Sequence, residues 1–172
     1  MEYWDGQLWK SVPDQHLTPQ EPTGRRANRI RFSPIETAKL RVTLTHSSGA
    51  VSGLSEIEAW GSSEFPVPAA PEPTPSLATR RSGKGYPKAS ASHTSRFDKV
   101  EYANDGKVNF NPSPNNRWTS YESPNPSDWL EIDFGEVKEI GRIELAIYDD
   151  HGGVQAPASY TVQFWDGSAW RD

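Results

Sequence analysis

Two short polar segments carry the side chains best suited to hold a small polar ligand. Asn115-Asn116-Arg117-Trp118, followed by Tyr121, places planar amide and guanidinium groups beside aromatic rings, and Tyr148-Asp149-Asp150-His151 adds carboxylates and an imidazole. A sugar needs an aromatic surface against the apolar C–H face of its ring, and planar polar groups for its adjacent hydroxyls. The residues predicted to bind a carbohydrate are therefore Asn116, Arg117, Tyr121, Asp150 and His151.

The same segments also have plainer interpretations. Asp150 and His151 precede Gly152-Gly153, an exposed turn, where ordinary solvation explains both side chains equally well. Tryptophan on a β-strand is normally buried, so we expect tryptophan rings in the hydrophobic interior rather than at a ligand. This expectation applies to Trp9, Trp118, Trp129 and Trp170.

Catalysis has little support in the sequence. Glu56 with Glu58, and Asp149 with Asp150, are carboxylates in close succession, but a glycosidase needs two carboxyl groups roughly 5–10 Å apart across a deep cleft. Nucleophile-elbow, phosphate-loop and paired-histidine metal motifs are absent, and the 4 histidines are scattered. The chain has no cysteine, which excludes disulfides, thiol nucleophiles and thiolate metal sites. We predict a protein that is not an enzyme.

Charge and hydropathy argue against two further classes of partner. The net charge is only -5, and no basic stripe is present, so nucleic acid is a poor candidate. No apolar run approaches the roughly 18 residues of a membrane span. The loops are rich in Asn, Ser, Asp and Pro, which disfavours insertion of apolar loop tips into a lipid surface.

The elements that must position these groups are β-strands. Apolar and polar residues alternate with a period of two in five runs, as in antiparallel sheets with one buried face. The 15 Pro and 13 Gly supply many turns and leave little room for helices. An all-β protein is predicted. The alternating runs are Ile30 to Phe32, Leu40 to Leu44, Leu130 to Phe134, Ile143 to Ile147 and Tyr160 to Phe164.

A proline-rich connector divides the chain. Residues 62–76 read SSEFPVPAAPEPTPS, which favours an extended spacer between a front block, 1–61, and a back block, 77–172. A decamer is repeated in the two blocks, since Glu2–Ser11 (EYWDGQLWKS) matches Gln163–Asp172 (QFWDGSAWRD). Either the chain spans the junction of two tandem domains, or it is one domain with its halves in exchanged order.

Ordered segments of both blocks carry a family likeness. The back block contributes Tyr86–Ser92, Ala103–Gly106, Arg117–Ser120, Asp128–Gly135, Ile143–Tyr148 and Pro157–Tyr160, and the front block contributes Asn28–Phe32, Thr37–Val42 and Gly53–Gly61. Together they resemble the discoidin superfamily, which includes coagulation-factor type C domains and galactose-binding-like modules of bacterial glycoside hydrolases. The resemblance implies a jelly-roll β-sandwich whose ligand site lies on loops at one end.

The order of the blocks departs from the family. There, the segment like 77–172 precedes the segment like 1–61. Because the termini of such domains often lie close together, circular permutation is tolerable. We expect the two blocks to complete one permuted sandwich, either within a monomer or in a domain-swapped dimer. Two half-domains with open sheet edges would instead be prone to aggregate.

The resemblance also implies a calcium site. Asp105 and Glu56 would supply carboxylates, and backbone oxygens near Tyr102, Lys107 and Ala59 would complete the shell of 6–8 oxygens that Ca²⁺ prefers. In the plainer alternative, Asp105 serves a turn and Glu56 faces solvent.

The function expected from these features is that of a secreted, non-catalytic carbohydrate-binding module attached to a glycoside hydrolase or a related polysaccharide-acting protein. The alternatives are an adhesion or membrane-surface discoidin domain and a ligand-free structural spacer in a large enzyme.

Overall fold

The computed structural model describes residues 2–4, 9–11, 14–61, 76–80 and 85–171. Within these residues all the long elements are strands, and the only helical segment is a short 3-10 turn, so the predicted all-β class is confirmed. No described helix is long and apolar enough to span a bilayer. The elements are β1 (Glu2–Trp4), β2 (Trp9–Ser11), β3 (His16–Thr18), β4 (Arg26–Thr45), β5 (Gly53–Trp60), β6 (Lys88–Ala91), η1 (Val100–Asn104), β7 (Trp118–Thr119), β8 (Ser127–Ile147), β9 (Ser159–Trp165) and β10 (Trp170–Arg171).

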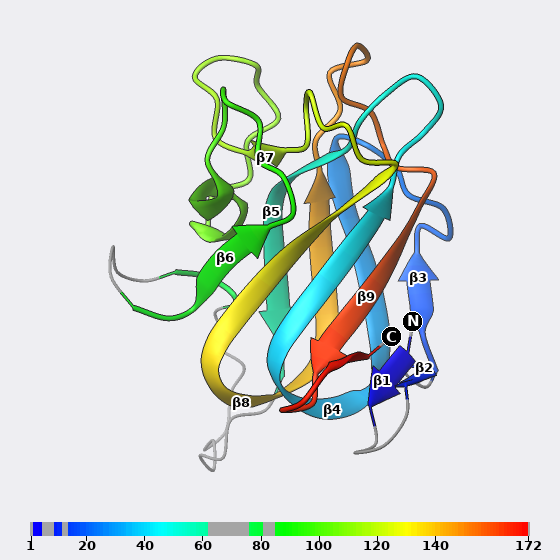
Figure 1. Cartoon of the computed structure of the whole chain (residues 1–172), viewed down its shortest axis with the longest axis vertical. Helices are drawn as coiled ribbons and strands as arrows, with labels where there is room; N and C mark the ends of the chain where they lie inside the picture. The colour runs from blue at the N-terminus through cyan, green and yellow to red at the C-terminus, as the bar shows by residue number, and fades with distance from the viewer. Residues whose placement is uncertain (1, 5–8, 12–13, 62–75, 81–84, 172) are drawn as a thin grey trace, which may run out of the picture.

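Two long strands, β4 and β8, curl over one another and create both layers of the fold (Figure 1). Residues 26–31 of β4 pair with β3 and with residues 142–147 of β8, which in turn pair with β5. Residues 39–45 of β4 pair with β9 and with the beginning of β8, which also pairs with β6. All these pairs are antiparallel, and the result is a curled sheet that is consistent with the β-sandwich expected from the resemblance.

The bends in the two strands have a local cause. The register of β4 against β8 shifts between Arg31 and Ile35, where Pro34 has no N–H to donate to a ladder. In β8 the chain passes through Gly135 at φ 76, and a Cβ there would lie 2.4 Å from the ring of Tyr86. Glycine therefore permits both the backbone angle and the close approach of the tyrosine.

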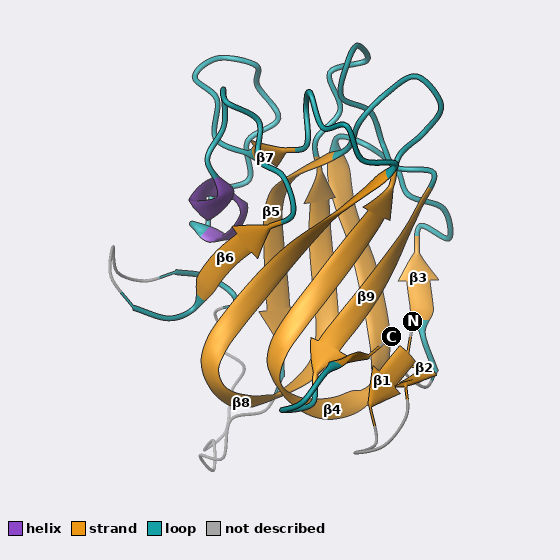
Figure 2. Cartoon of the chain, viewed as in Figure 1, coloured by secondary structure: helices purple, strands orange, loops and turns teal. Residues whose placement is uncertain are grey.

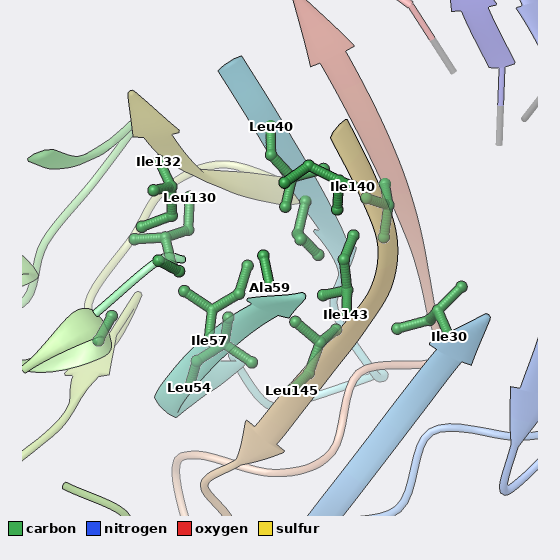
Figure 3. Close-up of a cluster of buried hydrophobic side chains, with 14 of the residues drawn as sticks. Ile30, Leu40, Leu54, Ile57, Ala59, Leu130, Ile132, Ile140, Ile143 and Leu145 are labelled. Carbon is green, nitrogen blue, oxygen red and sulfur yellow. The ribbon is translucent and has the colours of Figure 1, made fainter. Parts of the chain in front are cut away.

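One hydrophobic core lies between the layers and draws on both blocks of the chain (Figure 3). Leu40 is opposite Ile132 in register, and Ile57 is opposite Leu145. Each of these four side chains is at most 1% exposed. The described parts of the front and back blocks therefore share one interior. That they are family halves in reversed order stays a prediction, and residues 62–75 of the connector lie outside the described residues.

The repeated decamer forms two hairpins that contact one another. β1 pairs with β2, β9 pairs with β10, and the first hairpin contacts the second. In the second hairpin the Oδ1 atom of Asp166 accepts hydrogen bonds from the backbone N–H groups of Ser168 and Ala169. Gly167 follows at φ 99, which explains the Asp-Gly pair of the turn.

Candidate functional site

Loops that connect the strands gather at one end of the sandwich, where residues 46–52, 120–126 and 148–158 meet (Figure 2). Backbone hydrogen bonds tie them together. The N–H of Val51 donates to the Gly153 carbonyl at 3.2 Å, and the N–H of Gln155 donates to the Val51 carbonyl at 2.9 Å. The N–H of Ser120 donates to the Ser52 carbonyl at 2.9 Å. The three loops therefore form one preorganised surface.

A pocket of about 170 Å³ opens on this surface, and we call it the Arg117 pocket. Three of the five residues predicted to bind carbohydrate line it, namely Arg117, Tyr121 and Asp150. They come from segments up to 33 residues apart in the chain, before β7, after β7 and after β8. Other residues of its wall include Phe97, Asp98 and Thr119.

Arg117 is held in a fixed orientation. Its Nε atom lies 3.6 Å from Oδ1 of Asp98, and its guanidinium carbon lies 4.2 Å from the centre of the Tyr148 ring. The carboxylate of Asp98 is itself held, because it accepts hydrogen bonds from the hydroxyl of Thr119 and the amide of Asn115. A guanidinium that is stacked and paired in this way presents its remaining N–H donors in a defined direction.

Exposed aromatic rings stand beside Arg117. Tyr121 is 39% exposed and Phe97 is 57% exposed, and their ring centres are 6.3 Å apart. The two rings therefore offer an exposed aromatic surface beside the guanidinium. Phe97 was not predicted from the sequence, since nothing local in the Ser-Arg-Phe-Asp segment distinguishes it from a core phenylalanine. Only the folding of the loop after β6 brings it to Tyr121.

The predicted residues occupy different places around the pocket. Asp150 uses Oδ1 to accept hydrogen bonds from the backbone of Gly152 and Val154, which leaves Oδ2 without a hydrogen bond in the described part of the chain. His151 is 76% exposed at its side chain, lies 3.3 Å from Asp149, and is not part of the pocket wall. Asn116 also lies outside this wall, and its Nδ2 donates to Oδ1 of Asp105 at 3.3 Å.

The tryptophans divide between the interior and the outer face of the sheet. Trp118 is fully buried, as expected, and its Nε1 donates to the carbonyl of His93. The expectation of core packing is wrong for Trp129 and Trp170, which are partly exposed and stack on the guanidinium of Arg41 at 4.6 and 3.7 Å. In β8 the buried residues alternate from Leu130, so the preceding tryptophan faces outward. The side chain of Trp9 lies outside the described set.

Glu56 and Asp105, the predicted calcium ligands, lie together where β5 passes η1. Glu56 does not face solvent, because it is 1% exposed. Its Oε1 accepts a hydrogen bond from the N–H of Gly106 at 3.1 Å, while its buried Oε2 has no hydrogen-bond partner. Burial, with repulsion from Asp105 and Glu58, raises the pKa of Glu56 to about 9. Asp105 also serves the turn, since its Oδ1 accepts from the N–H of Lys107.

These donors fit a hard cation in part. A buried carboxylate oxygen without a partner, beside a second carboxylate, is the kind of donor that Ca²⁺ takes. The carbonyl of Ala59 already accepts a hydrogen bond from Leu77 at 2.6 Å. No group of three or more His, Cys, Asp or Glu that could hold a metal occurs among the described residues. Backbone and water oxygens would have to supply the rest of the shell.

A serine, a histidine and an aspartate also form a line beneath these loops. The two ring nitrogens of His46 contact Oγ of Ser52 at 3.3 Å and Oδ2 of Asp128 at 3.2 Å. Ser52 is fully buried, so its hydroxyl has no access to a substrate. Burial alone would raise the pKa of Asp128, but hydrogen bonds from Ser92 and other neighbours hold it below its ordinary value. These three side chains therefore have a structural role and hold the loops above them in place.

Comparison with known protein families finds a match to part of the chain. Residues 102–172 match a family described as "NedA-like, galactose-binding domain". The matched segment runs from η1 to β10 and includes Arg117, Tyr121 and Asp150. No solved structure matches the chain.

Proposed function

We propose that this chain, a member of the discoidin and galactose-binding-like superfamily, binds a carbohydrate in the Arg117 pocket. The observation that carries the proposal is the meeting of Arg117, Tyr121 and Asp150 in one pocket beside the exposed Phe97. Galactose-binding-like domains are generally non-catalytic, and the proposed role is binding alone.

Each side chain has a part in holding a sugar. The rings of Tyr121 and Phe97 offer an apolar surface to the C–H face of a pyranose. The guanidinium of Arg117 donates hydrogen bonds to hydroxyl oxygens, and Oδ2 of Asp150 accepts a hydrogen bond from a neighbouring hydroxyl. Asp98 and Asp150 place two carboxylates in the wall against one guanidinium. That balance favours a neutral sugar over an acidic one, because a sugar carboxylate would meet like charge.

Substitution of Tyr121 tests the proposal. Tyr121→Ala is expected to weaken binding of galactose by about tenfold or more, because the stacking surface is lost. Tyr86→Ala is the matched control, since Tyr86 is 53% exposed and packs on Gly135 away from the pocket. Isothermal titration calorimetry measures both. Equal affinities for the two variants would contradict the assignment of the pocket.

We further propose that calcium binds at Glu56 and Asp105. The unpartnered Oε2 atom of Glu56 supports this proposal. The ion would supply positive charge between two carboxylates that repel each other. Because Glu56 belongs to β5 and Asp105 follows η1, these residues would then hold the front and back blocks together through one site.

The wider setting that we propose is a secreted polysaccharide-acting protein, in which this domain holds a catalytic partner on its substrate. A membrane-surface role keeps one specific observation in its favour. Phe97 is an exposed apolar residue in a loop, with the guanidinium of Arg96 4.7 Å from its ring centre. Flotation with anionic phospholipid vesicles separates the two roles, since a carbohydrate-binding module stays in the unbound fraction.

A further inference from the structure

A second and larger cavity adjoins the Arg117 pocket. It has a volume of about 570 Å³, more than three times that of the pocket, and lies between residues 46–51 and 121–126. Gly153 completes its wall. We call it the His46 groove. None of the residues predicted to bind carbohydrate lines it, except Tyr121.

Tyr121 joins the two cavities, because its side chain is part of both walls. The ring lies directly against Gly153, where a Cβ would be only 2.8 Å from its Cε2 atom. Only a residue without a side chain allows this position of the ring. The adjacent Val51–Val154 bridge continues the connection, since Val51 lines the groove and Val154 lines the pocket.

Hydrogen bonds hold the side chains at the base of the groove. His46 is only 7% exposed at its side chain, and both ring nitrogens are occupied by Ser52 and Asp128. Asp128 in turn accepts a hydrogen bond from Nδ2 of Asn125 at 2.9 Å. His46 therefore forms a wall and does not serve as a hydrogen-bonding partner for a ligand. A cavity that is already formed loses little entropy when a ligand binds.

The remaining surface of the groove has the mixed character of a sugar site. Ala50, Val51 and Pro126 are apolar, and Tyr121 contributes an aromatic ring. Ser47 keeps an acceptor site on Oγ after donating to the Ala156 carbonyl. Asn125 is exposed and donates through Nδ2, which leaves its Oδ1 for a ligand hydroxyl. Glu122 is the carboxylate at the groove surface and is paired with Arg96 at 3.2 Å.

We propose that the His46 groove is a second subsite of the same binding site, and that it holds the sugar units next to the one in the Arg117 pocket. This inference rests on the proposed function. The ligand is then a neutral oligosaccharide or polysaccharide segment that crosses Tyr121, rather than a single terminal sugar. Neutral units suit the groove because it presents the carboxylate of Glu122 and no arginine or lysine among its lining residues.

Titration with galactose and with linear galacto-oligosaccharides of two, three and four units tests the inference. Affinity is expected to rise by about tenfold from galactose to the trisaccharide and then to level off, as each filled subsite adds contacts. In the wild-type protein, NMR amide signals of residues 47, 50 and 123 are expected to shift with the trisaccharide and to stay unchanged with galactose.

A variant that obstructs the groove tests whether the higher affinity for the trisaccharide arises there. Ala50→Trp places a bulky ring in the groove and obstructs it, so the trisaccharide is expected to bind no better than galactose, whose own affinity stays within about twofold of wild type. Ser48→Trp is the matched control, because Ser48 is an exposed residue of the same loop that does not line the groove. It is expected to keep the full gain.

The outcomes separate the two proposals. If neither galactose nor any oligomer binds, the proposed function itself is overturned. If galactose binds and longer chains bind no better, the extended site alone is overturned. If longer chains do bind better but Ala50→Trp keeps that gain, or if the three amide signals do not move, the extension exists elsewhere and the assignment to the His46 groove is wrong.

Discussion

One carboxylic acid of the fold is buried without a full set of hydrogen-bond partners. Glu56 is 1% exposed, and one of its oxygens has no hydrogen bond. With its pKa raised to about 9, Glu56 is protonated in the folded protein at neutral pH when no cation is present. In the unfolded chain the same group ionises near its ordinary value. Unfolding therefore releases the proton of Glu56 at neutral pH, and the free energy of unfolding depends on pH for that reason.

The sign of that dependence gives a prediction at the residue scale. A group whose pKa is raised by folding stabilises the folded state fully below its unfolded pKa, and this contribution is lost as pH rises toward about 9. In the presence of a chelator, the free energy of unfolding is expected to fall between pH 5 and pH 9 by up to about 1.4 kcal/mol per pH unit. The melting temperature is expected to fall over the same pH range.

Glu56→Gln is the informative variant for this prediction. Glutamine resembles the protonated acid, so the pH slope is expected to flatten, and the calcium-dependent rise in melting temperature expected of the wild type is expected to be lost in this variant. Glu101→Gln, at an exposed position in η1, serves as the control and should keep both effects. A wild-type melting temperature that is the same at pH 6 and pH 8.5 in chelator would contradict the role of Glu56.

Some residues of the pocket can be predicted from the sequence, and others cannot. Arg117, Tyr121 and Asp150 were predicted from residue chemistry, and they line one pocket. Phe97 was missed, because a lone phenylalanine in a loop carries no periodic signal. Whether it is buried depends on which loops lie around it, and that is settled by contacts with residues far away in the chain.

At the scale of elements, one tight turn holds the hairpin formed by β9 and β10. Arg171 is fully buried in β10 and pairs with Oδ2 of Asp166 at 3.1 Å. Burial would raise the pKa of Asp166, but hydrogen bonds from the backbone of Ala169 and Ser168, together with Arg171, hold it below its ordinary value. One carboxylate thus shapes the turn and neutralises a buried cation.

Removal of that carboxylate is expected to be costly. Asp166→Ala should lower the free energy of unfolding by about 2–4 kcal/mol, because the turn loses its acceptor and Arg171 loses an ion-pair partner. Asp166→Asn retains an acceptor for the turn and should cost roughly half as much. Urea unfolding of both variants measures the difference. Equal stabilities of Asp166→Ala and wild type would show that the hairpin contributes little.

At the scale of the whole molecule, the two blocks on either side of the connector share one interior. Val42 of β4 is opposite Leu130 of β8 and Val162 of β9, and these three side chains are at most 1% exposed. A core built from both blocks cannot form in either block alone. Because the two blocks share one core, they are expected to unfold together in a single cooperative transition.

Truncation of core side chains tests whether the two blocks unfold together. Ile57→Ala in the front block and Val162→Ala in the back block are each expected to destabilise the same single transition, by about 2–4 kcal/mol and about 1–3 kcal/mol respectively. Circular dichroism and tryptophan fluorescence should give coincident melting curves. Two separate transitions, each sensitive to only one variant, would show independent half-domains. The mass in solution then distinguishes a compact monomer from a swapped dimer.

The alternation of apolar and polar residues by itself determined that this chain is all-β, and which face of each long strand is buried. The ordered segments of the back block also predicted the galactose-binding-like family that residues 102–172 match. These features are local, because a strand alternates with a period of two whatever lies beside it. Tertiary structure alone decided which loops meet. The Arg117 pocket, the His46 groove and the buried Glu56 each combine segments that lie far apart in the chain, and no spacing within one segment encodes their distance.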